Sequence, residues 1–239
     1  MRNISQSQIN LYRNCPYGYY LRYAEKKQPI MYDPSVFEVG RRVHDAIDMY
    51  YKNHFRTDTN QEQILYDVYS VLRKDWDTTL PVEYLKKAYV CLENFSRWEC
   101  NNLQDKLYTK PLTEVKIPAN GFYGIVDYVD LKNSKYIDWK TNARAGLGYS
   151  YSIQAMMYKI LIESKFKIEL DEFTFQFLFV DEDRKVDLTT KKMMGVENDI
   201  YDFKDKIMES WKTGEFPKEP RTKNGCRGCS FKHYCGGAE

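Results

Sequence analysis

Two aspartates and a lysine lie close together in the stretch GIVDYVDLKNSKYIDWK, residues 124–140. Asp138 and Lys140 are two residues apart, so in a strand both side chains point to the same face. Carboxylates such as those of Asp127 and Asp138 are ligands that divalent cations prefer, and a lysine beside them can stabilise an anion. The stretch therefore predicts a metal site with a positive group next to it. The alternative is that these charges alternate on the solvated face of an antiparallel strand.

The elements that would position these residues are short strands. Segments 122–131 and 135–139 are rich in aromatic and β-branched residues, and the polar residues 132–134 between them predict a hairpin. A third segment of this kind, 112–117, carries Glu114. The three segments predict a meander, in which Glu114 either joins the two aspartates or faces solvent.

Further motifs stand in order around this stretch. They are Gly40-Arg41-Arg42-Val43-His44 on a predicted helix, Gly124-Ile125-Val126-Asp127, Asp138-Trp139-Lys140, and Gln154-Ala155-Met156-Met157-Tyr158. In this order they resemble the motifs of the PD-(D/E)XK nuclease superfamily, in its RecB-like branch. Without that resemblance, a lone histidine such as His44 beside an apolar stripe is more often a structural residue.

The resemblance implies a Mg²⁺- or Mn²⁺-dependent deoxyribonuclease. The implied metal ligands are His44, Asp127, Asp138 and the carbonyl of Trp139, and the implied catalytic set is Glu114, Asp127, Asp138, Lys140, Gln154 and Tyr158. A nitrogen ligand favours Mn²⁺ over Mg²⁺. The implied reaction is exonucleolytic hydrolysis of phosphodiesters at single-stranded DNA ends, in DNA repair, recombination, CRISPR adaptation or phage DNA metabolism.

Four of the six cysteines stand near the ends of the chain. Cys226, Cys229 and Cys235 form C-x-x-C-x-x-x-x-x-C in a glycine-containing tail, and Cys15 precedes a proline near the other end. Thiolates at this spacing can bind one metal centre. The pattern resembles that of RecB-like nucleases with one cysteine before the core and three after it, such as the nuclease domain of AddB, and this resemblance implies a 4Fe-4S cluster bound by Cys15, Cys226, Cys229 and Cys235. In chain size the protein is similar to CRISPR-adaptation exonucleases and their phage relatives. Zinc bound by the three tail cysteines and His233 is the alternative.

Positive charge is concentrated at the two ends. Residues 1–30 carry five Arg or Lys and one acid, and residues 212–239 carry six and three, although the whole chain has a net charge of only +2. If the ends meet, they form a cationic surface suited to a phosphate backbone. The predicted DNA contacts are Tyr12, Arg13, Tyr20, Arg22 and Arg41. Tyrosines and arginines mixed in this way are equally typical of ordinary packing.

The order of elements predicts an α/β protein with a mixed sheet, a restriction-endonuclease-like core flanked by helices. We expect one nuclease domain, made of a cluster and DNA segment (1–30), a helical subdomain (31–108), a nuclease core (109–213) and a cysteine tail (214–239). Helices are predicted at 33–55, 61–76, 81–107, 151–164 and 196–211, and further strands at 173–179 and 184–188. Ser5 and Ser7 are candidate caps of short N-terminal helices that break at Cys15-Pro16.

No apolar run in the sequence approaches the length of a membrane span, and the N-terminal residues are polar. We therefore expect a cytoplasmic protein of a bacterial, archaeal or phage-infected cell, with DNA as its partner and no membrane contact. The chain lacks the phosphate-binding motif of a helicase, so a helicase, integrase or recombination partner would be another chain. Two other functions remain open: a non-catalytic DNA-binding or adaptor subunit, and a zinc-stabilised regulator.

Overall fold

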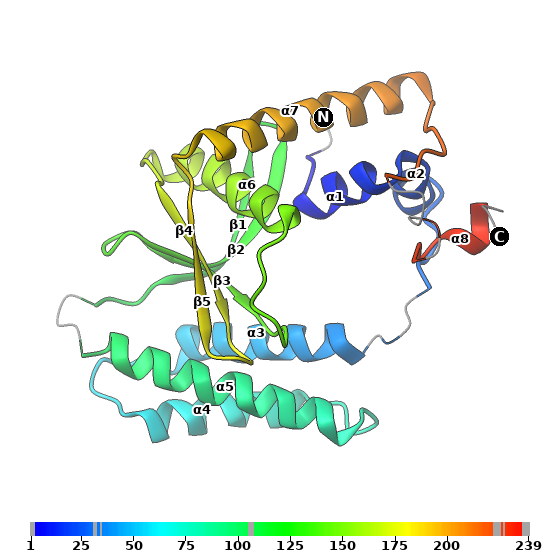
Figure 1. Cartoon of the computed structure of the whole chain (residues 1–239). Coiled ribbons are helices and arrows are strands. Elements are labelled where there is room, and N and C mark those ends of the chain that lie inside the picture. The colour runs from blue at the N-terminus through cyan, green and yellow to red at the C-terminus, as the bar shows by residue number, and fades with distance from the viewer. Residues whose placement is uncertain are drawn as a thin grey trace.

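A five-stranded sheet with the order β1-β2-β3-β4-β5 forms the centre of the molecule (Figure 1). The computed structural model describes residues 3–30, 33, 35–104, 108–221, 226 and 228–235. The strands are β1 (Leu112–Ala119), β2 (Phe122–Asp130), β3 (Lys135–Lys140), β4 (Glu172–Phe177) and β5 (Glu182–Asp187). All neighbouring strands are antiparallel except β3 and β4, which are parallel. The predicted meander and mixed sheet are thus confirmed.

Helices cover both sides of the sheet (Figure 1). The parallel strands β3 and β4 are joined through α6 (Tyr149–Phe166), because parallel strands need a long crossover. α6 and α7 (Lys191–Thr213) lie on one side of the sheet. On the other side lie α3 (Ser35–Asn53), α4 (Gln61–Asp75) and α5 (Val82–Asn102).

The sheet separates two hydrophobic cores. Val126 and Phe173 pack into the core on the side of α6 and α7, and Tyr128 and Trp139 pack into the core formed with α3, α4 and α5. The predicted helical subdomain therefore shares a core with the sheet and is held to it by apolar burial. This firm attachment matters because the helix α3 carries His44.

The N-terminal helices are α1 (Gln6–Asn14) and α2 (Pro16–Tyr23). They break where predicted, at Cys15, whose backbone is extended because a residue before proline disfavours the helical conformation. Ser5 caps α1 by accepting the backbone N–H of Gln8. Ser7, the other candidate cap, lies inside the first turn of α1.

Several helix ends differ from the predicted ones. The helix predicted at 196–211 begins five residues earlier, because the Thr190 side chain accepts the backbone N–H of Met193 and caps it there. α7 ends as predicted before Gly214, which has a left-handed backbone (φ 78°). Pro34 and Leu107, at predicted ends of two other helices, lie outside the described residues. No helix among the described residues is long and apolar enough to span a membrane.

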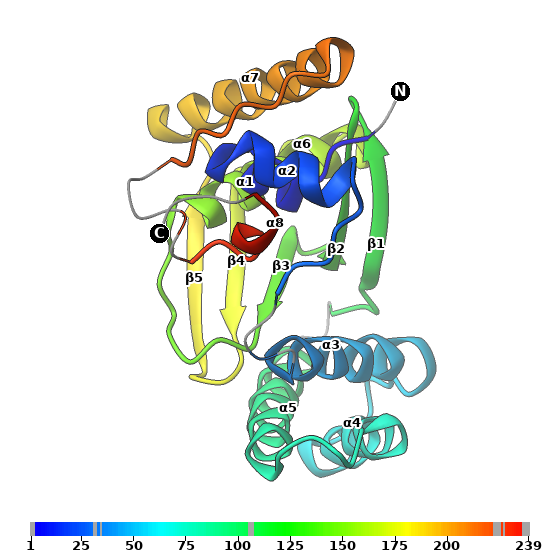
Figure 2. The same cartoon turned by 90° about the vertical axis from the view of Figure 1, so that its right-hand side faces the viewer.

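The C-terminal segment that follows α7 runs back to lie beside α2 and the residues after it (Figures 1 and 2). The backbone N–H of Arg221 donates to the carbonyl of Asn14 (2.9 Å), and that of Ile30 donates to the carbonyl of Ser230 (2.9 Å). The short helix α8 (Lys232–Cys235) lies beside this N-terminal segment. The described parts of the two basic segments therefore lie side by side, which is the condition under which the sequence analysis expects a cationic surface.

Candidate metal centre

The sheet opens between β2 and β3 at the predicted site. The two strands pair only from Tyr128–Ile137 to Asp130–Lys135. Beyond that point β3 pairs only with β4, and Asp127 reaches across the opening: its Oδ2 accepts the backbone N–H of Trp139 at 2.8 Å. The Asp127 carboxylate thus accepts the hydrogen bond that a backbone carbonyl of β2 would accept in a continuous β-ladder. An acidic side chain therefore lines the opening between the two strands.

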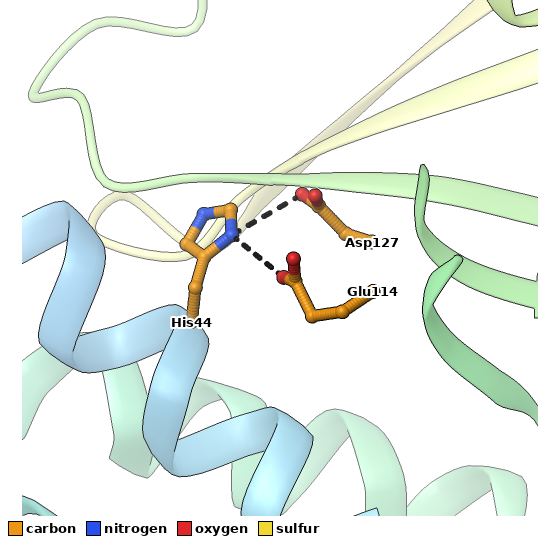
Figure 3. A group of neighbouring side chains, drawn as sticks. All are labelled: His44, Glu114 and Asp127. Carbon is orange, nitrogen blue, oxygen red and sulfur yellow. Dashed lines mark ion pairs between the residues drawn. The ribbon is translucent and has the colours of Figure 1, made fainter. Parts of the chain in front are cut away.

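Three side chains from three elements point toward one another in this opening (Figure 3). Nδ1 of His44 on α3 lies 3.6 Å from Oε1 of Glu114 on β1 and 3.5 Å from Oδ2 of Asp127 on β2. One ligand atom from each lies within 4.8 Å of the others, which makes this the set of metal-ligand side chains that comes together among the described residues. The three could hold one divalent cation.

His44 is oriented by its second nitrogen. Nε2 lies 3.0 Å from the carbonyl oxygen of Trp139. Because a carbonyl can only accept, Nε2 carries the hydrogen, and Nδ1 is the nitrogen that faces the carboxylates. Ligating histidines are commonly held in this way by a backbone carbonyl. The Trp139 carbonyl, predicted as a metal ligand, here accepts this hydrogen bond.

Glu114 has an unusual backbone for a strand residue. Its φ is 47°, in the left-handed region that favours glycine. A non-glycine residue in this region carries a cost of order 1–3 kcal/mol, and such residues are concentrated at functional sites. This conformation accompanies the position of its carboxylate beside His44, so Glu114 faces the site and not solvent.

Asp138 belongs to a second, adjoining network. Its Oδ1 accepts hydrogen bonds from Gln154 Nε2 (2.7 Å) and from the Tyr158 hydroxyl (3.0 Å). Its Oδ2 forms an ion pair with Lys140 Nζ (2.6 Å), and Lys140 also donates to Gln154 Oε1 (3.0 Å). The structure therefore brings together Asp138, Lys140, Gln154 and Tyr158, as predicted, but Asp138 is not part of the close group formed by His44, Glu114 and Asp127.

Burial and crowding of charge perturb both networks. Burial lowers the pKa of His44, but Asp127, Glu114 and Asp138 outweigh it and raise that pKa to about 9. Burial and then the Asp138 carboxylate raise the pKa of Asp127. Burial lowers the pKa of Lys140, and Asp138 more than reverses this effect. The closely spaced carboxylates repel one another, and a divalent cation bound between them would relieve this repulsion.

A glycine sets the distance between β2 and α6. A Cβ at Gly124 would come within 2.6 Å of Leu161 Cδ1 and 3.5 Å of the Tyr158 ring. A side chain at this position would have to displace Leu161, so glycine lets α6 pack this closely with Leu161 in its present position. This close approach brings Gln154 and Tyr158 to Asp138, and it explains the glycine of the motif that ends at Asp127.

The sequence analysis missed the aromatic surroundings of Lys140. Its Nζ lies 5.4 Å from the ring centroids of both Tyr151 and Phe175. Cations are attracted to ring faces at this distance. Tyr151 could have been recognised, because it lies one turn before Gln154 on the same helix.

The four end cysteines border one cavity of about 450 Å³. Cys15 comes from the junction of α1 and α2, and Cys226, Cys229 and Cys235 come from the tail. Their sulfur atoms are not among the described groups whose ligand atoms lie within 4.8 Å of one another. His233 does not line the cavity, and its ring packs on Tyr234.

The five residues predicted to contact DNA differ in burial and in their partners. Tyr12 is buried and its hydroxyl bonds Ser210 (2.8 Å), so it is a core residue and we remove it from the DNA-contact set. Arg13 lies over the Tyr149 ring at 4.1 Å. The others are partly exposed: Tyr20 bonds Glu25, Arg22 bonds Gln28, and Arg41 bonds Glu38 and Asp45.

A mixed sheet flanked by helices, with acids, a histidine and a lysine at a parted pair of strands, defines a nuclease-like α/β protein. A model of the PD-(D/E)XK nuclease superfamily matches residues 3–236, and the chain belongs to this family. Its members are nucleases that use a divalent metal, so membership implies a hydrolase acting on nucleic acid. No curated protein matches the chain. Among solved structures it is similar to "Crystal structure of SSO0001", with 11% identity and a TM-score of 0.41 over 98% of this chain and 86% of that one.

Proposed function

We propose that the chain is a Mg²⁺- or Mn²⁺-dependent deoxyribonuclease that digests single-stranded DNA from its ends. The observation that carries this proposal is the meeting of His44, Glu114 and Asp127 where β2 and β3 part, with Lys140 on the adjoining strand. Metal ligands from three elements beside a buried lysine are what hydrolysis of a phosphodiester needs.

The side chains fit a divalent cation. Two carboxylates suit Mg²⁺ or Mn²⁺, and the imidazole favours Mn²⁺. His44, Glu114 and Asp127 would hold the ion, and Asp138 would join them by exchanging a hydrogen bond for a metal bond. When bound, the cation supplies Lewis-acid activation of the scissile phosphate and of the attacking water.

Lys140 would stabilise the charge that develops on the phosphate. Its Nζ is largely buried between Asp138 and the rings of Tyr151 and Phe175, so its interaction with an anion is weakly screened. Gln154 would position Lys140, since its Oε1 accepts from Nζ, while Tyr158 and Gln154 Nε2 fix Asp138. These residues act on orientation and need no contact with the metal.

The residues on the N-terminal helices favour single-stranded DNA as the substrate. Arg13, Arg22 and Tyr20 lie on α1 and α2, on the opposite side of the site from α3 (Figure 1). Arginines follow a phosphate backbone by electrostatics, and tyrosine rings stack on bases of any sequence. A strand end that contacts α1 and α2 as well as the metal ligands would be held by these cationic and aromatic residues while its phosphate is cleaved.

We infer that Cys15, Cys226, Cys229 and Cys235 hold a 4Fe-4S cluster. Zinc places sulfur ligands about 2.3 Å from the metal, so two of them are at most about 4.6 Å apart. The cysteine sulfurs are not gathered in this way but surround one cavity, which favours a larger group. A bound cluster would supply four iron–thiolate bonds that tie the two ends of the chain together.

The test of the nuclease is digestion of end-labelled single-stranded DNA with Mg²⁺, Mn²⁺ or a chelator. We expect cleavage only with metal, faster with Mn²⁺, and progressing from one end. Lys140→Met should lower the rate about 100-fold or more while metal affinity is retained. Lys185→Met is the matched control, because Lys185 pairs with Glu172 at the edge of the sheet. Absence of cleavage by wild type loaded with metal and cluster, on single or double strands, would refute the proposal and favour a binding subunit.

A further inference from the structure

Phe37 is the most exposed of the large hydrophobic side chains in the described part of the chain, at 68%. Val36, beside it, is 45% exposed. Single exposed apolar residues are common on protein surfaces, so exposure alone says little about Phe37. Its position on α3 relative to the metal centre is the informative observation.

His44 and Asp48 lie on the face of α3 that meets the sheet, and helical spacing places Gly40 and Phe37 on the same side of the helix. A Cβ at Gly40 would lie 3.5 Å from Thr141 Oγ1, just after β3. His44 meets Trp139 and the acids, and Asp48 accepts a hydrogen bond from Thr113 on β1 (2.6 Å). This face thus runs along the opening of the sheet.

Phe37 continues this face beyond the metal centre. It is seven residues before His44, which is nearly two turns and about 10 Å along the helix. This end of α3 points toward the segment that leads back to α2 (Figure 1). Phe37 therefore lies about two helical turns from His44, at the end of α3 that is nearer to α2 (Figure 1).

We propose that Phe37 stacks on a base of the substrate strand within a few nucleotides of the scissile phosphate. The inference rests on the proposed function and adds a positioning residue to it. A phenylalanine ring has no hydrogen-bonding group, so it binds any base by stacking and selects no sequence. Its exposed neighbour Arg41 is held by Glu38 and Asp45, so Phe37 is the exposed aromatic ring of the first turns of this helix, beside a guanidinium that is already paired. Stacking there would hold the strand as the phosphate enters the metal site.

The experiment measures binding of fluorescein-labelled oligothymidylate by anisotropy, with chelator present so that the strand stays intact. Phe37→Ala should weaken binding about 5- to 150-fold, the range seen when a stacking aromatic is removed. Tyr66→Ala is the matched control, because Tyr66 is 67% exposed and lies on α4, away from the site. Phe37→Trp should restore binding and Phe37→Leu should not. The slope of log affinity against log salt should stay unchanged, since no phosphate contact is lost.

A single abasic nucleotide, moved along the strand one position at a time, locates the stacked base. At one position the abasic strand should bind wild type and Phe37→Ala equally, because the ring then has no partner. An equal penalty at every position, full binding by Phe37→Ala, or a changed oligomeric state would overturn the inference. A wild-type enzyme that cuts DNA while Phe37→Ala binds normally refutes this inference alone, whereas a wild type that neither binds nor cuts refutes the proposed function as well.

Discussion

At the scale of single residues, the structure adds most to the interpretation of Glu114, which from the sequence could either join the two aspartates or face solvent. Its carboxylate joins His44 and Asp127, and its backbone is held at φ 47°. A residue kept in a costly conformation beside two side chains that can bind a metal leads to the prediction that Glu114 is a third ligand. Glu114→Gln should lower affinity for Mn²⁺ at least about 10-fold, because an amide lacks the charge that attracts the ion. Isothermal titration calorimetry with Mn²⁺ measures this affinity.

The control for this prediction is Glu172→Gln. Glu172 lies on β4, is exposed, and forms an ion pair with Lys185 far from the site. Its removal should leave Mn²⁺ affinity unchanged. If Glu114→Gln binds Mn²⁺ as tightly as this control, Glu114 is not a ligand.

A second acid, Glu99, is buried far from the metal centre in the core of the helical subdomain. Its Oε2 accepts hydrogen bonds from the hydroxyls of Tyr51 (2.6 Å) and Tyr108 (2.8 Å), whereas Oε1 has no hydrogen-bond partner among the described residues. Burial raises the pKa of Glu99 to about 7, and the tyrosine hydrogen bonds only partly oppose this. The folded protein therefore retains the proton at pH values where the unfolded chain has released it.

The sign of the pH dependence follows from this difference. Between the ordinary glutamate pKa and about 7 the folded state binds more protons than the unfolded state, so stability falls as pH rises through this window and levels off above it. The loss is on the order of 3 kcal/mol for this group, at about 1.4 kcal/mol per pKa unit. Glu99→Gln should remove that loss, so urea unfolding at pH 5 and pH 8 should differ less than in wild type. An equal difference in both proteins would contradict the assignment.

At the scale of elements, the contact between β2 and α6 is set by Gly124. The missing Cβ leaves room for Leu161 and Tyr158, so Gly124→Ala should force α6 away and destabilise the protein by about 1–3 kcal/mol. Activity should fall further than stability explains, because Gln154 and Tyr158 move with the helix. Gly146→Ala, where nothing lies within 4 Å of an added Cβ, is the control.

A double variant separates a local clash from a general weakness of the strand. Leu161→Ala removes the atom that the new methyl group would meet. In Gly124→Ala with Leu161→Ala, urea unfolding should show less destabilisation than the sum of the two single variants, since neighbouring sites couple. Additive effects would show that the cost of Gly124→Ala arises elsewhere.

The sequence predicts these elements well and their junctions less well. Alternation and turn composition locate β2 and β3, and period two places Asp138 and Lys140 on one face. No local pattern shows that the two strands part beside Asp127, because this depends on α3 and α6 packing from either side. For the same reason the sequence could not tell that Asp138 turns toward Gln154 and Tyr158, or that Glu114 has a left-handed backbone.

At the scale of the whole molecule, the two ends are joined by contacts from distant parts of the chain. The Trp211 indole donates to the Tyr19 hydroxyl (3.1 Å), and backbone hydrogen bonds link Asn14 with Arg221. Cys15 and Cys226 are 211 positions apart in the sequence yet border the same cavity. Only the similarity of the cysteine pattern to that of a known family suggested this meeting, since spacing says nothing about so long a loop.

A cluster that closes this loop would restrict the unfolded chain strongly. The logarithmic estimate gives on the order of 5 kcal/mol for a loop of this length. Cys15→Ser should therefore lose bound iron and unfold at a much lower urea concentration than wild type. Cys100→Ser, on α5 and outside the cavity, should keep both iron and stability. Iron analysis of the purified proteins separates the outcomes: zinc in place of iron would identify the alternative metal, and full iron content in Cys15→Ser would show that the N-terminal cysteine is not a ligand and that protein contacts alone hold the ends together.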